Sequence, residues 1–199
     1  MTYSKSEKTK QFIIEKVSPI FNRKGYAGTS LSDLTKATGL TKGSIYGNFK
    51  NKDEVAIEAC KYNLSTILNS LMKDIADSSA TPFEKLVILP KNYLSVYGKI
   101  TAIGGCPIMN TASDADDTHP QLKKIIQDTV VNLNGLIVSL IQEGINLKQI
   151  RSDIEPVKTA NVIISLVEGG LLISKLFDDK SYFTNSIEQV EKIVMGLKL

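Results

Sequence analysis

Residues 29–52, TSLSDLTKATGLTKGSIYGNFKNK, decide the fold of this chain. Ser30 can cap a helix, and Gly39 follows where that helix must stop, because glycine adopts the left-handed conformation of a helix C-cap without steric cost. Thr41 can cap a second helix, which we expect over residues 42–49. Two short helices joined by a glycine turn form a helix-turn-helix, whose second helix enters the major groove of DNA.

Helical spacing divides the second helix into two faces. Ile45 and Phe49 are four residues apart, so they share a face and are expected to pack on Leu31 and Leu34 of the first helix. The other face and the exit carry small residues that permit close approach, and hydroxyl, amide or ammonium groups suited to phosphate oxygens. These residues are Thr41, Lys42, Gly43, Ser44, Tyr46, Asn48 and Lys52. The alternative is a packed helical pair with no role in DNA binding.

Charge is unevenly distributed along the chain. Residues 1–52 hold ten lysines and arginines against three acidic residues, whereas the whole chain holds 24 against 21. A basic module joined to a mildly acidic remainder is typical of a protein that binds nucleic-acid phosphates. A solvated lysine-rich surface is the alternative, but it would not explain why the excess coincides with the helix-turn-helix.

Composition restricts the remaining classes of protein. At 199 residues the chain can bury a substantial core in one or two domains. Residues 1–10 are polar and do not resemble a signal peptide. The longest apolar stretch, 160–177, is interrupted by Asn161, Glu168 and Lys175, which predicts a buried helix and no membrane span. Two cysteines fit a reducing cytoplasm, and with one histidine they form no metal cluster. We expect a cytoplasmic protein without cofactor or metal.

Apolar residues recur at helical spacing through the rest of the chain, which predicts an all-α protein of about nine helices. Two of these helices, at about 156–177 and 182–197, are candidates for a homodimer interface. The first is apolar on more than one side, and its glycine pair, Gly169 and Gly170, permits a close helix crossing. The second carries one apolar stripe. The alternative is that both helices only complete the core of a monomer.

The segment 103–107, Ile-Gly-Gly-Cys-Pro, is the most informative element outside the helix-turn-helix. Because Pro107 suits the first turn of a helix, Cys106 is predicted to lie at a helix N-terminus, which stabilises a thiolate. Cys106 is therefore a candidate sensor of oxidants or electrophiles, with Lys175 as a possible neighbour. The alternative, which we favour, is a small buried hydrophobic residue.

Residues 12–62 resemble the N-terminal domain of the TetR family of bacterial repressors. The resemblance is carried by FNRKGYAGTSLSDLTKATGLTKGSIYGNFKNKDE, residues 21–54, in which many positions agree in fixed register. Thr35 departs from the customary alanine, and Asn48 stands where histidine is common. The matching positions are Phe21, Gly25, Tyr26, Thr29, Ser30, Thr41, Lys42, Gly43, Ser44, Ile45, Tyr46, Phe49 and Lys52. Thr29 and Ser30 thereby join the predicted DNA contacts.

The resemblance implies a division of the chain into two domains. A three-helix DNA-binding domain is expected over residues 1–50, and an effector-binding and dimerisation domain over 51–199. The segment GGCPIMNTASD also resembles a stretch in one branch of TetR-type C-terminal domains. Few charges lie on the relevant helix faces, so we expect a small, mostly apolar effector. The candidate pocket residues are Tyr93, Tyr97, Cys106, Met109, Asn110, Asn134 and Glu168.

The function that follows is a dimeric, ligand-responsive transcriptional repressor that binds a palindromic operator and is released by its effector. A repressor that senses redox or electrophiles through Cys106 is the alternative. An enzyme is not expected, because the only histidine, His119, precedes Pro120 in a predicted loop and no catalytic spacing is present. The long C-terminal bundle argues against an architectural DNA-binding protein without a ligand.

Overall fold

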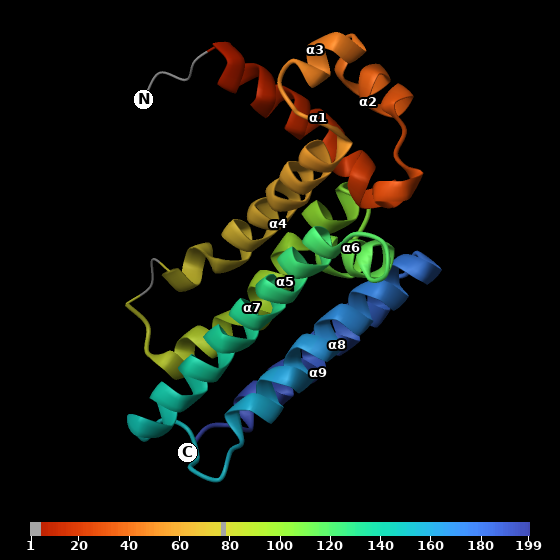
Figure 1. Ribbon diagram of the computed structural model, residues 1–199. Coiled ribbons are helices and arrows are strands. Elements are labelled where there is room, and N and C mark those ends of the chain that lie inside the picture. The colour runs from red at the N-terminus through yellow and green to blue at the C-terminus, as the bar shows by residue number, and fades with distance from the viewer. Residues whose placement is uncertain (1–4, 77–78) are drawn as a thin grey trace. The chain divides into compact units, whose positions relative to one another are not determined.

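The computed structural model describes residues 5–76 and 79–199. Within these ranges the chain forms nine helices and no strand, which confirms the all-α prediction (Figure 1). An isolated antiparallel bridge joins Ile150 to Lys198. The helices are α1 (Lys5–Gly28), α2 (Leu31–Thr38), α3 (Lys42–Tyr46), α4 (Lys52–Ala76), α5 (Pro82–Ala102), α6 (Pro107–Ala115), α7 (Pro120–Asn146), α8 (Pro156–Phe177) and α9 (Lys180–Met195).

Packing divides the chain into two units. The first contains α1, α2, α3, the part of α4 that ends at Thr66, and residues 102–126 with α6. The second contains residues 67–101 and 127–199, with α8 and α9. Because α6 packs against α1, the first unit is larger than the predicted DNA-binding domain. The functional boundary after residue 50 stays a prediction.

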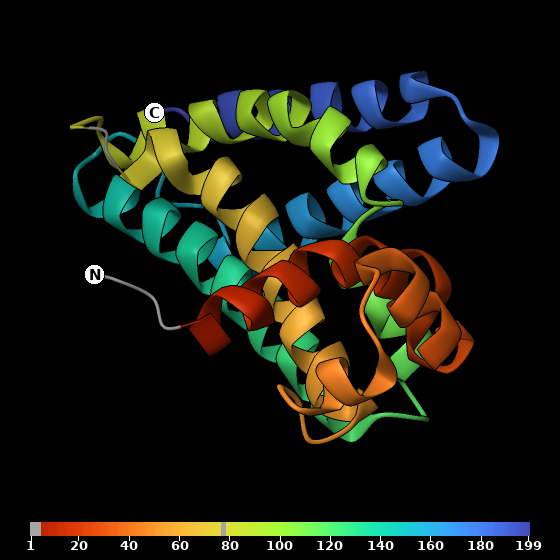
Figure 2. The ribbon, with the colours of Figure 1, turned by 90° about the horizontal axis from the view of Figure 1, so that it is seen from above.

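One apolar core holds α1, α2, α3 and the start of α4 together. As the helical spacing predicts, Ile45 and Phe49 are buried in the same cluster as Leu34, and Leu31 packs against it. Figure 2 shows α1 lying across the start of α4, with α2 and α3 beside it. Burial stabilises such a side chain by roughly 1.5–3 kcal/mol, so this core fixes α3 on α1 and α4. Its buried residues are Ile13, Val17, Phe21, Leu34, Ile45, Phe49, Val55, Ala56 and Ala59.

The predicted caps fix both helices of the helix-turn-helix. The Asp33 backbone N–H donates to the Ser30 hydroxyl at 3.1 Å, and the Ser30 backbone N–H donates to the Asp33 carboxylate at 2.9 Å. This reciprocal pair is a capping box. Gly39 ends α2 in the left-handed conformation, with φ of 69°. Thr41 caps α3 by accepting from the Ser44 N–H at 3.2 Å. Both predicted N-caps and the C-cap glycine are confirmed.

Helix α3 is shorter than the predicted range of 42–49. It ends at Tyr46, and a turn follows. In a longer helix the Asn48 backbone N–H would donate to the Ser44 carbonyl. Instead it donates to Ile45 at 3.0 Å, and the Asn48 side-chain amide donates to the Ser44 carbonyl at 2.9 Å. The side chain thus replaces the backbone donor and ends the helix.

Helices α8 and α9 pack side by side in the second unit (Figure 1). Helix α8 has the predicted bounds, whereas α9 begins and ends two residues earlier than the predicted 182–197. Helix α9 begins earlier than predicted because the Asp179 side chain caps it by accepting from the Ser181 N–H at 2.8 Å. At the other end Leu197 has left the helix, and its carbonyl accepts from the Arg151 N–H at 3.0 Å.

The glycine pair of α8 faces two different surroundings. A Cβ at Gly170 would collide with Ser186 of α9, so the close crossing predicted from the pair lies within the chain. A Cβ at Gly169 would meet nothing within 4 Å. Gly169 shares its side of α8 with Val162, Leu172 and Leu176, which are 43%, 46% and 70% exposed. Helix α8 therefore packs one side on α9 and exposes a second, apolar side.

Helices α7 and α8 are both long and apolar enough, by length and composition, to span a membrane. Core helices of globular proteins have the same property. Helix α8 carries Lys158, Glu168 and Lys175, and it packs one side against α9. These charges and this packing agree with the helix of a globular core that the sequence predicts.

Candidate nucleic-acid interface

Five of the residues predicted to contact DNA lie on α3 or at its N-cap. Thr41, Lys42 and Gly43 are exposed, and Ser44 and Tyr46 are half-buried. A Cβ at Gly43 would meet only the Thr41 hydroxyl, 3.9 Å away. The start of α3 is therefore open to close approach by a flat or grooved surface.

Thr29 does not share this surface. It is 1% exposed, and its hydroxyl donates to the Gly25 carbonyl at 2.7 Å. Its role in the structure is to join the end of α1 to the start of α2, so we remove it from the proposed contacts. Ser30 is exposed, but its hydroxyl also donates to the Asp33 carboxylate at 2.8 Å. Any contact between Ser30 and DNA must therefore leave its capping hydrogen bonds with Asp33 in place.

Asn48 is half-buried, and its side chain already has two partners. Besides its bond to Ser44, its side-chain oxygen accepts from the Ser6 hydroxyl of α1 at 3.2 Å. An amide nitrogen carries two hydrogens, so one N–H of Asn48 is left for a phosphate oxygen. The substitution of histidine by asparagine at this position therefore preserves a donor.

Ion pairs neutralise part of the excess positive charge in the first unit. Lys24 pairs with Asp33 at 2.6 Å, and Lys10 lies 4.0 Å from Glu54. Hydrogen bonds from Lys24 and from Ser30 hold the pKa of the Asp33 carboxyl well below its usual range. Lys42 at α3 and Lys50 at its exit stay exposed. Part of the positive charge that remains therefore lies at the helix proposed to meet DNA, and Lys16 and Lys36 on α1 and α2 are exposed as well.

Lys52, the last predicted contact, lies beside an aromatic cluster. Its ammonium is 4.4 Å from the centroid of the Tyr26 ring. The Tyr26 hydroxyl donates to the Asp53 carboxylate, and this bond, together with burial and the Asp53 charge, raises the pKa of Tyr26 to about 12. The His119 ring meets the Tyr26 ring edge-on, with centroids 4.7 Å apart. His119 follows α6 in a loop, as predicted, yet it is only 7% exposed.

A polar joint that sequence reasoning missed connects α1 to the segment before α6. The buried Asn22 side chain donates to the carbonyls of Ile103 at 3.0 Å and Gly105 at 2.9 Å. The Asn110 side chain returns a bond to the Asn22 carbonyl at 2.9 Å and another to Gly104 at 3.1 Å. Of the two glycines that drew attention to this segment, Gly105 therefore presents its carbonyl to α1 and Gly104 presents its carbonyl to α6.

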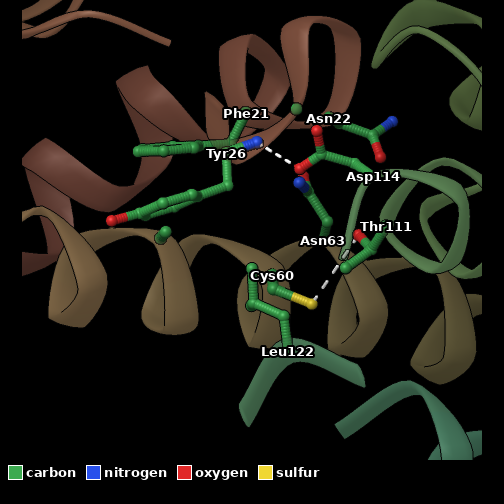
Figure 3. Close-up of a pocket in the computed structure, with 10 residues that line it drawn as sticks. Phe21, Asn22, Tyr26, Cys60, Asn63, Thr111, Asp114 and Leu122 are labelled. Atoms are coloured by element: carbon green, nitrogen blue, oxygen red, sulfur yellow. Dashed lines mark hydrogen bonds between the residues drawn. The ribbon is translucent and has the colours of Figure 1, made fainter. Parts of the chain in front are cut away.

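A small cavity lies next to this joint (Figure 3). Its volume is about 20 Å³, which is room for one water molecule and too little for an effector. In Figure 3 the Tyr26 backbone N–H points at the Asp114 carboxylate, and the Cys60 thiol points at Thr111. Burial raises the pKa of the Cys60 thiol to about 11, so Cys60 stays a neutral packing residue.

The predicted pocket residues are divided between the two units. Cys106, Met109 and Asn110 belong to the first, and Tyr93, Tyr97, Asn134 and Glu168 belong to the second. In the second unit the Tyr97 hydroxyl lies 2.7 Å from the Ser174 hydroxyl of α8, and its ring stacks on Phe183 of α9 at 5.1 Å. Tyr93 is buried, and the Asn134 amide donates to Asn161 at 2.7 Å.

Cys106 occupies the position that the sequence predicts, as the N-cap of α6 with Pro107 in the first turn. It is only 8% exposed. Reactive cysteines are partially exposed, so this burial favours the interpretation of Cys106 as a packing residue.

Two family models match the chain. Residues 13–59 match the model of bacterial regulatory proteins of the tetR family. Residues 82–190 match a model described as a tetracyclin repressor-like C-terminal domain. The first match contains α2 and α3 and ends within α4, and the second extends from α5 into α9.

Solved structures and relatives agree with these matches. A TetR-family transcriptional regulator from Cytophaga hutchinsonii is 40% identical with a TM-score of 0.90, over 100% of this chain and 99% of that one. An uncharacterized HTH-type transcriptional regulator of Bacillus subtilis, YxaF, is 27% identical over 94% of this chain and 95% of its own. The HTH-type transcriptional repressor DhaR of a Mycobacterium species is 25% identical over 84% of this chain and 82% of its own. All three are named as transcriptional regulators.

Proposed function

This chain belongs to the TetR family of bacterial transcriptional regulators, and on that premise we propose that it is a dimeric repressor of a palindromic operator, released by a small, mostly apolar effector. Repression is supported by the similarity to DhaR, whose name describes a repressor. We propose the cytoplasm as its location, because its operator is there.

The observation that carries the proposal is the exposed start of α3 on a buried base. Ile45 is fully buried and Phe49 is 3% exposed, so packing on the core holds this side of the helix in place. A helix anchored on one side and open on the other can enter the major groove as a rigid reader. The proposed contacts are Ser30, Thr41, Lys42, Gly43, Ser44, Tyr46, Asn48 and Lys52, which omits the buried Thr29.

The exposed apolar side of α8 supports a homodimer. Val162, Leu172 and Leu176 lie with Gly169 on one face of that helix, where a second copy could pack closely. Helix α9 buries its own stripe within the chain, with Ile187 at 1% and Val190 at 0% exposure. We therefore propose that α8 makes most of the contact, with α9 contributing from its flank. A two-fold dimer is also what recognition of two half-sites requires.

The effector is proposed to bind among the aromatic and amide residues predicted from the sequence. Tyr93 and Tyr97 on α5 are the strongest candidates, because the Tyr97 ring already stacks on Phe183 and its hydroxyl meets Ser174. Such a setting offers apolar contact with one or two polar groups, which is typical of a small-molecule site. No observation favours oxidant sensing by the buried Cys106, so we do not adopt that alternative.

Binding to DNA from the region upstream of its own gene tests the proposal. Lys42→Ala is expected to weaken operator binding and to lower the salt slope of affinity by about one. Tyr46→Phe keeps the packed ring and removes the hydroxyl, so it should weaken binding about tenfold, since a hydrogen bond to a charged group contributes roughly 1.5–3 kcal/mol. Fluorescence anisotropy at several salt concentrations measures both changes.

Lys61→Ala is the matched control, because it removes an exposed lysine of the same unit that lies on α4 and pairs with Glu58 at 2.8 Å. The control should bind as tightly as the unaltered protein. Equal losses in all three variants, or no binding to any tested fragment, would contradict the proposal.

A further inference from the structure

We propose that Tyr26 and His119 are positioning residues for the DNA contact of Lys52. The inference rests on the proposed function, and it concerns how one ammonium group is held before DNA arrives. Lys52, Tyr26, Asp53 and His119 all belong to the first unit. They come from α4, α1 and the residue before α7, so three segments meet at the Tyr26 side chain.

The Tyr26 ring restricts the Lys52 side chain. A lysine that contacts a phosphate must first be ordered, and this costs conformational entropy. The Lys52 ammonium lies 4.4 Å from the ring centroid, where the negative face of the aromatic ring attracts a cation. An ammonium has three N–H groups, so the face turned from the ring can still donate to a phosphate oxygen. Contact with Tyr26 therefore orders the Lys52 side chain before DNA binds, so less conformational entropy is lost when the ammonium meets a phosphate.

Tyr26 is itself held at both ends. Its hydroxyl donates to the Asp53 carboxylate, and its raised pKa keeps that hydroxyl a donor throughout the neutral range. Its backbone N–H donates to the Asp114 carboxylate of α6 at 2.5 Å. Gly25 makes this approach possible, because its φ is 72° and a Cβ there would collide with Asp114. The ring below Lys52 is thus a fixed platform.

His119 supports the platform from the side. Its Nδ1 accepts from the Leu122 backbone N–H at 3.2 Å, so a neutral imidazole carries its proton on Nε2. That Nε2 lies 3.8 Å from the Asp53 carboxylate that also accepts from Tyr26. The edge of the imidazole meets the Tyr26 ring at an interplanar angle of 76°. The residue before α7 therefore limits where the ring and Asp53 can move.

A double-mutant cycle on DNA affinity separates positioning from a general structural role. Tyr26→Leu is expected to weaken operator binding about threefold to tenfold, because it removes the platform. His119→Asn, which keeps an acceptor at the position of Nδ1 for the Leu122 N–H and removes the ring, should weaken binding about twofold. In a Lys52→Met background neither change should weaken binding further, because the ammonium they position is gone.

Lys50→Met is the matched background, since Lys50 is an exposed lysine two residues before Lys52. In that background Tyr26→Leu should cost the same factor as in the unaltered chain. An equal loss in the Lys52→Met background, or unchanged or tighter binding by Tyr26→Leu, would overturn the positioning role. Failure of the unaltered protein to bind its upstream DNA would instead overturn the proposed function.

Discussion

Asp33 connects the end of α1 to the start of the helix-turn-helix through a single carboxylate. It accepts from Lys24 at 2.6 Å and from the Ser30 backbone N–H at 2.9 Å. Both bonds favour the ionised form and lower the pKa of this carboxyl. A carboxyl whose pKa is lower in the folded state stabilises the fold above its unfolded pKa of about 4, and this stabilisation is lost as the pH falls towards the folded value.

Asp33→Asn should therefore lower the thermal midpoint of the protein by a few degrees at pH 7. The difference from the unaltered protein should shrink as the pH falls from about 4 towards the lower folded-state pKa, because the unfolded chain then binds a proton that the folded carboxylate does not, and this removes the advantage of the charge. Thermal unfolding followed by circular dichroism between pH 7 and pH 2 measures this convergence. Glu191→Gln, on an exposed position of α9, is the control and should shift the midpoint little at any pH. A difference that stays constant with pH would contradict the role given to the Asp33 charge.

At the scale of the element, Gly170 decides how closely α8 approaches α9. A Cβ there would lie 2.7 Å from the Ser186 Cβ and 3.4 Å from the Phe183 Cα, so α9 would have to move. Gly170→Ala is expected to lower the free energy of unfolding by about 1–3 kcal/mol, the cost of overpacking. Gly98→Ala on α5 is the control, because its Cβ would meet nothing within 4 Å. There alanine should stabilise the helix by up to about 1 kcal/mol. Urea unfolding at one protein concentration measures both, and equal effects would contradict this account of the crossing.

The elements also show what the sequence could predict. Ser30, Gly39 and Thr41 act on residues within a few positions of themselves, so capping rules located them, and helical spacing identified Ile45 and Phe49 as buried. The end of α3 was placed too late because a side chain, Asn48, competes with the backbone for one carbonyl. That competition has no periodic signal.

The joints of the first unit depend on contacts between distant positions, which spacing cannot reveal. Asn22 bonds to carbonyls 81 and 83 residues away, and Tyr26 bonds to an aspartate 88 residues away. His119 was predicted to be an ordinary loop residue, because only the fold brings it to Tyr26. Thr29 was assigned to DNA from the family register, whereas the structure uses its hydroxyl at the end of α1.

The whole molecule combines a helix anchored on a buried core, α3, with an exposed apolar face on α8. In the proposed function, the core under α3 holds the helix with which one chain reads one half-site, and the exposed apolar side of α8 is the surface on which a second chain packs. Neither feature alone gives a regulator that recognises a palindrome. The family to which the chain belongs supports their combination.

Footprinting on DNA from upstream of its own gene tests this combination most directly, together with the mass of the protein in solution. We predict a dimer and one protected palindrome, with half-sites about 34–36 Å apart or a multiple of this distance. Leu172→Glu on the exposed side of α8 should give monomers and remove the footprint, whereas Glu191→Gln should change neither. A monomer that protects a single, non-palindromic site with full affinity, or a footprint that survives Leu172→Glu unchanged, would contradict the account.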